Sequence, residues 1–193
     1  MSPPNPEHAV QEDINLRNAE VFQEIYDLHH LMVFRFIYGL HGGPTEEVED
    51  LTAETFARAW KSRRRFKGSD QAALGWLIKI ARNLVIDTFR RQKIRNVIQD
   101  IDKHYITTDD PQPEEQALIR EQVRILWSLM KTLPTQQREI LVLRYMLGWR
   151  VQEIGEHLAI KENTVSVYIR RALQRLRQDW PESNDENRST KTN

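Results

Sequence analysis

The last part of the chain contains a helical pattern with two different faces, and this pattern constrains the fold more than any other feature. Across residues 162–179, apolar side chains recur at helical spacing on one side: Val165, Ile169, Ala172, Leu173 and Leu176. At about 100° per residue, a mainly polar set falls on the opposite side: Asn163, Val167, Arg170, Arg171 and Gln174. A helix with an apolar back and an Arg/Asn/Gln front is suited to pack on a small domain and to face a polyanion.

Two shorter helical segments precede this one, and the three together predict a helix-turn-helix. The expected helices cover residues 135–146, 150–158 and 162–179. Gly148 ends the first of them, and residues 159–161 form a tight turn before the last. In a helix-turn-helix that binds DNA, the last helix enters the major groove.

The composition favours helices along the whole chain. Only 7 of the 193 residues are glycine and 8 are proline, and alternation of β-branched residues is almost absent. We therefore expect an all-α protein with two small helical domains joined by a flexible acidic linker. The absence of cysteine excludes disulfides and thiolate metal sites and fits a cytoplasmic protein.

The domain limits follow from the breaks in the helical pattern. The first domain is expected at residues 15–96, with helices over residues 15–40, 45–64 and 71–91. Thr45 is the expected cap of the second helix. The linker is expected at 97–114 and the second domain at 115–180, where a helix ending near Lys131 precedes the helix-turn-helix. Residues 1–14 and 181–193 are polar and are expected to be disordered.

The formal net charge is zero, but the charges are segregated along the chain. Residues 58–95 contain twelve Lys or Arg and two acidic residues, residues 100–121 contain seven acidic residues, and residues 166–177 contain four arginines and no acid. Two basic blocks on separate domains indicate two surfaces that bind a polyanion. A solvated charged face without a ligand is the alternative, above all for the first block.

No sequence feature indicates catalysis, a cofactor or a metal site. The chain has no GxxxxGK[ST] phosphate loop and no serine in a nucleophile elbow. His29 and His30 are adjacent on a predicted helix, where their side chains point about 100° apart and are poorly placed to share one ion. Acidic pairs such as Glu46 and Glu47 lie at a predicted helix start, where the helix dipole accounts for them. We expect a protein that is not an enzyme and that needs no cofactor.

Three motifs follow one another along the chain. Residues 49–60, EDLTAETFARAW, resemble the DLxQExFxxxW segment of the bacterial sigma-70 family. Residues 66–91 contain FKG, WLIKIARN and DTFRR, which resemble the FRG…WLxxIAxNxxxDxxRR segment. Leu133-Pro134, Arg138, Gly148-Trp149, Glu153-Ile154 and Thr164-Val165 resemble the C-terminal helix-turn-helix. The short chain resembles the group IV or ECF (extracytoplasmic function) class, which keeps only regions 2 and 4.

The resemblance implies an RNA polymerase sigma factor. Such a protein would bind the β and β′ subunits of core RNA polymerase, recognise the −10 and −35 promoter elements, and support promoter melting and transcription initiation. An anti-sigma factor is a further implied partner, and no membrane insertion is expected. The family implies core-polymerase binding for Asp50, Glu54, Phe56 and Trp60. A position in the hydrophobic core is the alternative for Phe56 and Trp60, and Trp76, in the segment that resembles the −10 reader, is also expected to be a packed core residue.

Region 2 of the family captures a base flipped from the melted −10 element, and basic side chains around it hold phosphates. The resemblance implies this −10 role for Lys61, Arg63, Arg64, Arg65, Phe66, Lys67, Gly68, Ser69, Lys79, Arg82, Asn83, Arg90 and Arg91. The last helix is implied to read the −35 element through Asn163, Thr164, Ser166, Val167, Arg170, Arg171 and Gln174. Ser166-Val167-Tyr168 replaces the usual basic run of the family, so the promoter sequence is not implied.

Two other classes of protein stay open at this point. A freestanding helix-turn-helix regulator would bind DNA as a dimer and would use the first domain for sensing or dimerisation. A helical adaptor that binds only proteins would have no use for basic faces on both domains. The acidic linker has two interpretations as well: it threads the polymerase active-site cleft, or it is a solvated tether.

Overall fold

The computed structural model describes residues 14–98 and 114–181, and every regular element in these ranges is helical. The elements are α1 (Ala19–His41), α2 (Thr45–Ser62), the 3-10 turn η1 (Arg63–Arg65), α3 (Asp70–Ile98), α4 (Glu114–Thr132), α5 (Thr135–Leu141), the π-helical turn η2 (Val142–Met146), α6 (Val151–Leu158) and α7 (Glu162–Gln178). The expected all-α fold with two helical domains is confirmed. The expectations for residues 1–13, 99–113 and 182–193 lie outside the described residues.

Several predicted helix ends differ from the observed ones. The first helix begins at Ala19 instead of residue 15, because the Asn18 side chain accepts a hydrogen bond from the backbone N–H of Glu20 and caps it. Gly42 ends this helix in the left-handed conformation, with φ of 62°. Thr45 is the first residue of α2 and not its cap, since Pro44 occupies the cap position. The third helix continues to Ile98, beyond the expected end at residue 91.

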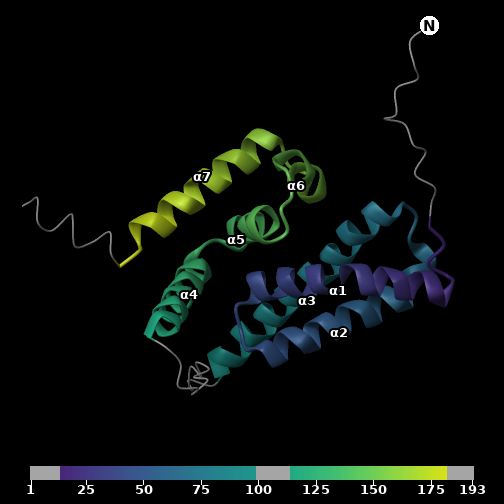
Figure 1. Ribbon diagram of the computed structural model, residues 1–193, viewed down its shortest axis with the longest axis horizontal. Helices are drawn as coiled ribbons and strands as arrows, with labels where there is room; N and C mark the ends of the chain where they lie inside the picture. The colour runs from purple at the N-terminus through teal and green to yellow at the C-terminus, as the bar shows by residue number, and fades with distance from the viewer. Residues whose placement is uncertain (1–13, 99–113, 182–193) are drawn as a thin grey trace, which may run out of the picture.

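Helices α1, α2 and α3 pack against one another as a bundle (Figure 1). The buried stripe of α1 contains Phe22, Ile25, His29, Val33, Phe36, Ile37 and Leu40. Leu28 lies three residues after Ile25, at helical spacing, but it is 58% exposed. The stripe is rotated by one position there, so that the neighbouring His29 is buried instead. In α3, the buried residues include Leu77, Ala81 and Leu84.

Helices α5, α6 and α7 form the helix-turn-helix. Ile140, Leu143, Ile154, Val165 and Ala172 are its most buried apolar residues. Leu173, expected on the apolar side, is 38% exposed. The turn between α6 and α7 is tight because Ala159 adopts the left-handed conformation, with φ of 54°. Gly155 permits the turn, since a Cβ at this position would lie 2.9 Å from the backbone oxygen of Ile160.

The two domains are in contact with each other, which the sequence did not predict. Helix α1 packs against α5 and η2, and Figure 1 shows α5 between α7 and the α1–α3 bundle. Gly39 of α1 faces the side chain of Val142. Tyr38 of α1 stacks edge-on against Trp127 of α4, with ring centroids 5.0 Å apart. The buried apolar residues therefore form one continuous cluster across both domains.

Candidate nucleic-acid interface

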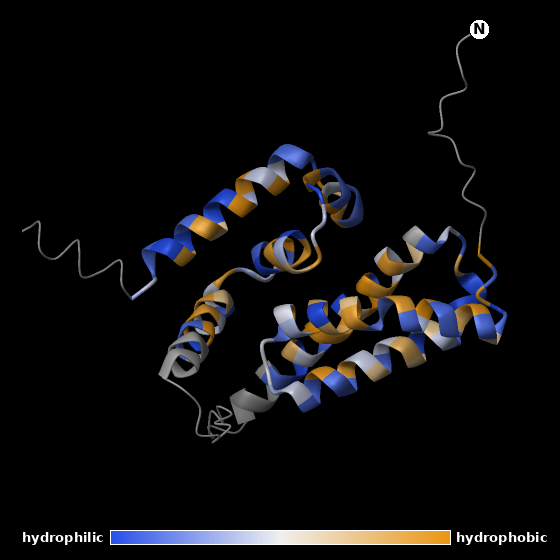
Figure 2. Ribbon diagram, viewed as in Figure 1, coloured by the Kyte–Doolittle hydropathy of each residue, from blue (hydrophilic) through white to orange (hydrophobic). Residues whose placement is uncertain are grey.

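The front of α7 is an exposed polar surface on a buried apolar base. Val165 and Ala172 are fully buried at its back. The front residues Asn163, Ser166, Arg170, Arg171 and Gln174 are exposed, and Thr164 and Val167 are half-buried at the edge. Figure 2 shows this helix as hydrophilic stretches interrupted by hydrophobic positions. Every residue expected to read the −35 element therefore lies on one accessible face or at its margin.

Polar contacts in and around the loop before α6 fix the position of α6 within the helix-turn-helix. Arg144 donates a hydrogen bond from Nη1 to the backbone oxygen of Trp149, at 2.9 Å. The backbone N–H of Arg150 donates to Glu153 Oε2 at 2.6 Å and closes the start of α6. The Trp149 ring meets His157 edge-on, with centroids 5.0 Å apart. These contacts fix α6, and α6 in turn supports α7.

The residues expected to bind the −10 element lie on η1, the loop after it, and α3. Eight of these side chains are exposed: Lys61, Arg64, Arg65, Lys67, Lys79, Asn83, Arg90 and Arg91. Arg63 instead lies over the Trp60 ring, 3.5 Å from its centroid, and donates to the Trp60 backbone oxygen. Phe66 packs on Trp76 with ring centroids 4.9 Å apart, and both side chains are half-buried against the core. This surface is broad, basic and mostly open to solvent.

Arg82, one of the residues expected to bind the −10 element, contacts α5 of the second domain instead. Arg82 Nε lies 2.7 Å from Glu139 Oε1 of α5, and the Glu139 side chain is fully buried while that of Arg82 is 35% exposed. Neither carboxylate oxygen of Glu139 accepts a hydrogen bond from the described residues, so the contact is an ion pair with imperfect alignment. Burial raises the pKa of Glu139, and Arg82 partly opposes this effect.

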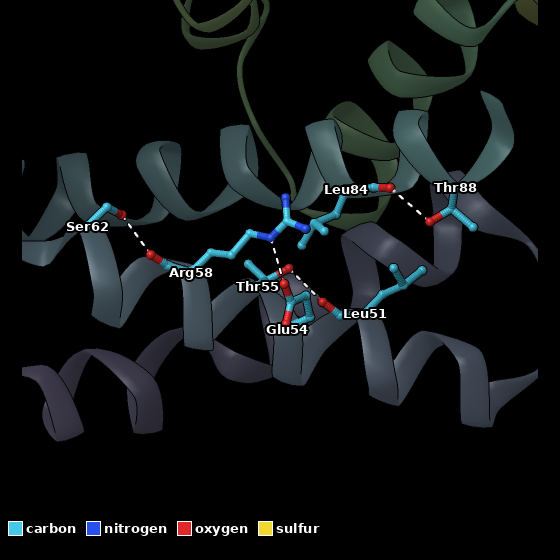
Figure 3. Close-up of polar contacts among 7 residues, drawn as sticks. All are labelled: Leu51, Glu54, Thr55, Arg58, Ser62, Leu84 and Thr88. Carbon is cyan, nitrogen blue, oxygen red and sulfur yellow. Dashed lines mark hydrogen bonds and ion pairs between the residues drawn. The ribbon is translucent and has the colours of Figure 1, made fainter. Parts of the chain in front are cut away.

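The α2 surface combines carboxylates with aromatic rings. Asp50 and Glu54 are exposed, and Arg58 Nε donates to Glu54 Oε1 at 2.7 Å, which lowers the pKa of Glu54 (Figure 3). Figure 3 also shows the Thr55 hydroxyl turned inward onto the backbone oxygen of Leu51, so it does not compete for this face. Phe56 is 5% exposed and belongs to the core, whereas Trp60 is 37% exposed.

Sequence reasoning missed the aromatic residues of α1 that complete this surface. Phe22 meets the Trp60 ring edge-on at 5.0 Å, and Tyr26 meets Phe56 edge-on at 4.7 Å. Tyr26 is 38% exposed. The four-residue spacing of Phe22 and Tyr26 on one helix was the available signal. Sequence reasoning also assigned no role to Glu139, because nothing local distinguishes it from a surface glutamate.

Comparison with known proteins identifies the family. The model of Sigma-70 region 2 matches residues 25–95, and the model of Sigma-70, region 4 matches residues 124–176. The ECF RNA polymerase sigma factor SigX of Bacillus subtilis is 31% identical over 162 residues, which cover 82% of each chain. The chain belongs to the ECF RNA polymerase sigma factors. As a member of this family, the sigma factor binds core RNA polymerase and directs promoter recognition and transcription initiation.

A further relative agrees with this assignment, and two solved structures share the fold. SigL of Mycobacterium tuberculosis, another ECF RNA polymerase sigma factor, is 29% identical over 159 residues, covering 82% of this chain and 88% of SigL. The fold is similar to that of RpoE of Bartonella quintana, solved in complex with the anti-sigma factor NepR, with a TM-score of 0.64 and 20% identity over 83% of this chain and 96% of RpoE. It is also similar to CnrH, solved in complex with the cytosolic domain of CnrY, with a TM-score of 0.60 and 23% identity over 82% of this chain and 86% of CnrH.

Two kinds of feature are absent from the residues that the structure describes. None of the helices in residues 14–98 and 114–181 has the length and apolar content that a bilayer crossing requires. The same ranges contain no group of three or more His, Cys, Asp or Glu residues placed to hold a metal ion.

Proposed function

We propose that the front of α7 reads the −35 element in the major groove. The observation that carries this proposal is the exposed pair Arg170 and Arg171 on a helix whose back, at Val165 and Ala172, is fully buried. An arginine that binds guanine bidentately contributes about 1–3 kcal/mol of discrimination. The proposed reading surface also includes Asn163, Thr164, Ser166, Val167 and Gln174.

Region 2, over residues 15–96, recognises the −10 element in this proposal. Asn83 and the loop residues Phe66, Lys67, Gly68 and Ser69 surround a base flipped from the melted strand. The phosphates of that strand are held by basic side chains: Lys61, Arg63, Arg64, Arg65, Lys79, Arg82, Arg90 and Arg91. The support is that most of these side chains are exposed to solvent.

The surface of α2 binds the core polymerase. Asp50 and Glu54 offer exposed carboxylates to a basic partner, and Trp60 of the same helix offers the part of its ring that Arg63 and Phe22 leave exposed. Phe56 acts indirectly, since it is buried beneath this surface and holds the ring of Tyr26. The β and β′ subunits of the polymerase are the expected partners.

Three further assignments complete the proposed function. The sigma factor performs no bond chemistry itself and needs no cofactor, because initiation uses the catalytic centre of the polymerase. It acts in the cytoplasm, where polymerase and promoter meet. An anti-sigma factor controls it, as suggested by RpoE and CnrH, which were both solved with a partner protein.

A footprinting experiment tests the two DNA-reading roles. The holoenzyme should protect an asymmetric region with separate −10 and −35 contacts, and the sigma factor alone should not protect two symmetric half-sites. A symmetric footprint by the sigma factor alone would support the dimeric helix-turn-helix regulator instead. Binding of the holoenzyme to duplex −35 DNA should weaken in Arg170→Ala and in Arg171→Ala. It should not weaken in Gln178→Ala, a substitution at another exposed position of α7. This result would assign the DNA-reading face of α7 to the side that carries the two arginines.

A further inference from the structure

The loop that joins η1 to α3 is short and closely packed. It covers residues 66–69, which belong to the proposed −10 site, and we call it the −10 loop. Gly68 has a φ of 150°, and a Cβ there would lie 3.0 Å from the Cβ of Ala72 and 3.3 Å from the ring of Phe66. The backbone oxygen of Ser69 accepts a hydrogen bond from the N–H of Ala72 at 3.0 Å, where α3 begins. The loop therefore depends on a glycine at residue 68, and its shape is fixed from within.

The chain before α1 lies beside the −10 loop and bonds to it. The backbone N–H of Ile14 donates a hydrogen bond to the backbone oxygen of Gly68 at 3.0 Å, and Figure 1 shows the purple start of the described chain next to the link between α2 and α3. Leu16 is 2% exposed and anchors this segment in the hydrophobic core. Asn15 forms a turn toward α1, since its side chain and its backbone oxygen accept hydrogen bonds from the N–H groups two and three residues later. The position of Ile14 is therefore set by its own neighbours and not by the loop.

A second contact reaches the end of the −10 loop from α1. Nε2 of His29 lies 3.5 Å from Oδ1 of Asp70, the first residue of α3. The His29 side chain is 10% exposed, and its Nε2 has no hydrogen-bond partner among the described residues. Burial of an unpaired polar atom costs free energy, so the carboxylate of Asp70 is the polar group that offsets this cost. The contact favours a position of Asp70, and of the loop end before it, close to α1.

We propose that Ile14 and His29 are positioning residues for −10 recognition, which hold the −10 loop in the shape that accepts one flipped base. The inference rests on the proposed −10 role of this loop. A site discriminates between bases when its groups are held in place before the base arrives, because a mobile loop adapts to several bases. Ile14 lies before residues 25–95, the range that the Sigma-70 region 2 model matches. The base-reading site thus includes support from a segment outside that range.

The first experiment measures the mobility of the −10 loop in the full chain without DNA. The chain has no cysteine, so a fluorophore at Lys67→Cys, an exposed loop position, reports this mobility by time-resolved anisotropy. Ile14→Pro removes the N–H that bonds to Gly68, and His29→Leu removes the contact with Asp70 and keeps an apolar side chain in the core. Both substitutions should increase the mobility of the probe. Unchanged mobility in both variants would overturn the proposal.

Three matched variants accompany these two. Ile14→Ala shortens the side chain and keeps the backbone N–H. His29→Gln keeps a donor that can reach Asp70 and should rescue the loop. His30→Leu makes the same chemical change as His29→Leu at the adjacent, exposed position. All three should keep the probe close to its wild-type mobility. Equal loosening in these variants would mean that the first domain responds to any change nearby, and would also overturn the proposal.

The second experiment measures base discrimination by the holoenzyme. Open-complex formation is compared on four templates of one transcribed promoter that differ in a single base of the melted −10 strand. Wild type should prefer one base by about tenfold, and Ile14→Pro and His29→Leu should lower this preference to about threefold or less. Binding to core polymerase and to a −35 duplex should stay unchanged, which a general loss of structure would not allow. A full wild-type preference in both variants would contradict the positioning role.

Direct changes at the proposed site separate this inference from the function on which it rests. Ser69→Ala alters the −10 loop itself, and Asn83→Ala alters the amide proposed to bond the base. If these two lower the base preference and Ile14→Pro and His29→Leu do not, the loop reads DNA without the support of α1 and the inference fails. If the probe becomes mobile but none of the four substitutions changes the preference, the contacts hold the loop and the proposed −10 function fails.

Discussion

Arg138 donates a hydrogen bond from Nη1 to the backbone oxygen of Leu40, at 3.1 Å, and thereby joins the helix-turn-helix to the end of α1. Its Nη2 donates to the backbone oxygens of Lys131 and Leu133, at 3.0 and 3.3 Å. One guanidinium group therefore satisfies carbonyls near the C-terminal ends of α1 and α4, where helix dipoles favour a positive charge. Burial lowers the pKa of Arg138.

Replacing Arg138 by methionine should destabilise the protein by about 3 kcal/mol, because three hydrogen bonds from a buried charged group are lost and the accepting carbonyls lose their partners. Urea unfolding followed by circular dichroism measures the effect. Arg150→Met, at an exposed position, is the control and should change the unfolding free energy by less than about 0.5 kcal/mol. Equal stability of the two variants would contradict the bridging role of Arg138.

Ala159→Gly should stabilise the helix-turn-helix by up to about 1 kcal/mol. Ala159 has a φ of 54°, and a left-handed alanine costs roughly 1–2 kcal/mol that glycine avoids, less the greater chain entropy of glycine when unfolded. Ala57→Gly, at an exposed position inside α2, should destabilise by about 1 kcal/mol. Thermal melts of wild type and both variants provide the comparison. If both substitutions shift the melting temperature in the same direction from wild type, Ala159 is not strained.

Arg171→Ala should weaken transcription that depends on the −35 element and leave core-polymerase binding unchanged. The side chain is exposed on α7, and loss of one bidentate guanine contact costs about 1–3 kcal/mol. Transcription on promoters with and without a −35 element, together with a core-binding assay, separates the two effects. Equal loss in both assays, or no loss in either, would remove Arg171 from the reading face.

Asn83→Ala should impair promoter opening and preserve binding to a −35 duplex. Asn83 is exposed on α3, far along the chain from the reading helix, and an amide at this place can bond the edge of a flipped base. Permanganate reactivity of unpaired thymines measures the opening. The assignment fails if the open complex forms at the wild-type rate.

His157 should make the protein less stable as the pH is lowered from about 6.5 toward 4. Burial, with Lys79 and Arg82 nearby, lowers the pKa of His157 from 6.5 to about 4, so the unfolded chain binds a proton in this window and the folded protein does not. Glu139, whose pKa is raised, acts in the opposite direction, but it does so equally in wild type and in His157→Phe.

The stability difference between wild type and His157→Phe therefore isolates the histidine. Phenylalanine can keep the edge-on contact with Trp149. Thermal melts of both proteins at pH 7 and pH 5 should show a larger decrease for wild type. Parallel decreases would mean that His157 is not kept neutral by its surroundings.

Much of this architecture is readable from the sequence, because it depends on local patterns. The helical spacing around Val165 and Ala172 identified the back of α7 and, by difference, its exposed front. The predicted helix ends were less accurate. The start of α1 depends on a single capping side chain, that of Asn18, and the sequence has only a weak break where α3 continues to Ile98.

The domain junction could not be predicted in this way. Gly39 looks like an ordinary helix glycine until Val142, more than a hundred residues later, is placed against it. Glu139 looks like a surface acid, and only the tertiary contact with Arg82 gives it a buried position. The rotation of the α1 stripe, which exposes Leu28 and buries His29, has the same origin, since packing of the other helices decides which face turns inward.

In vitro transcription with purified core RNA polymerase tests the central claim most directly. A library of genomic fragments is transcribed with core polymerase alone, with the sigma factor added, and with the Asp50→Ala/Glu54→Ala variant added. The account predicts defined start sites that appear only with the wild-type sigma factor and are reduced with the variant. Start sites that are the same with and without the protein would contradict it.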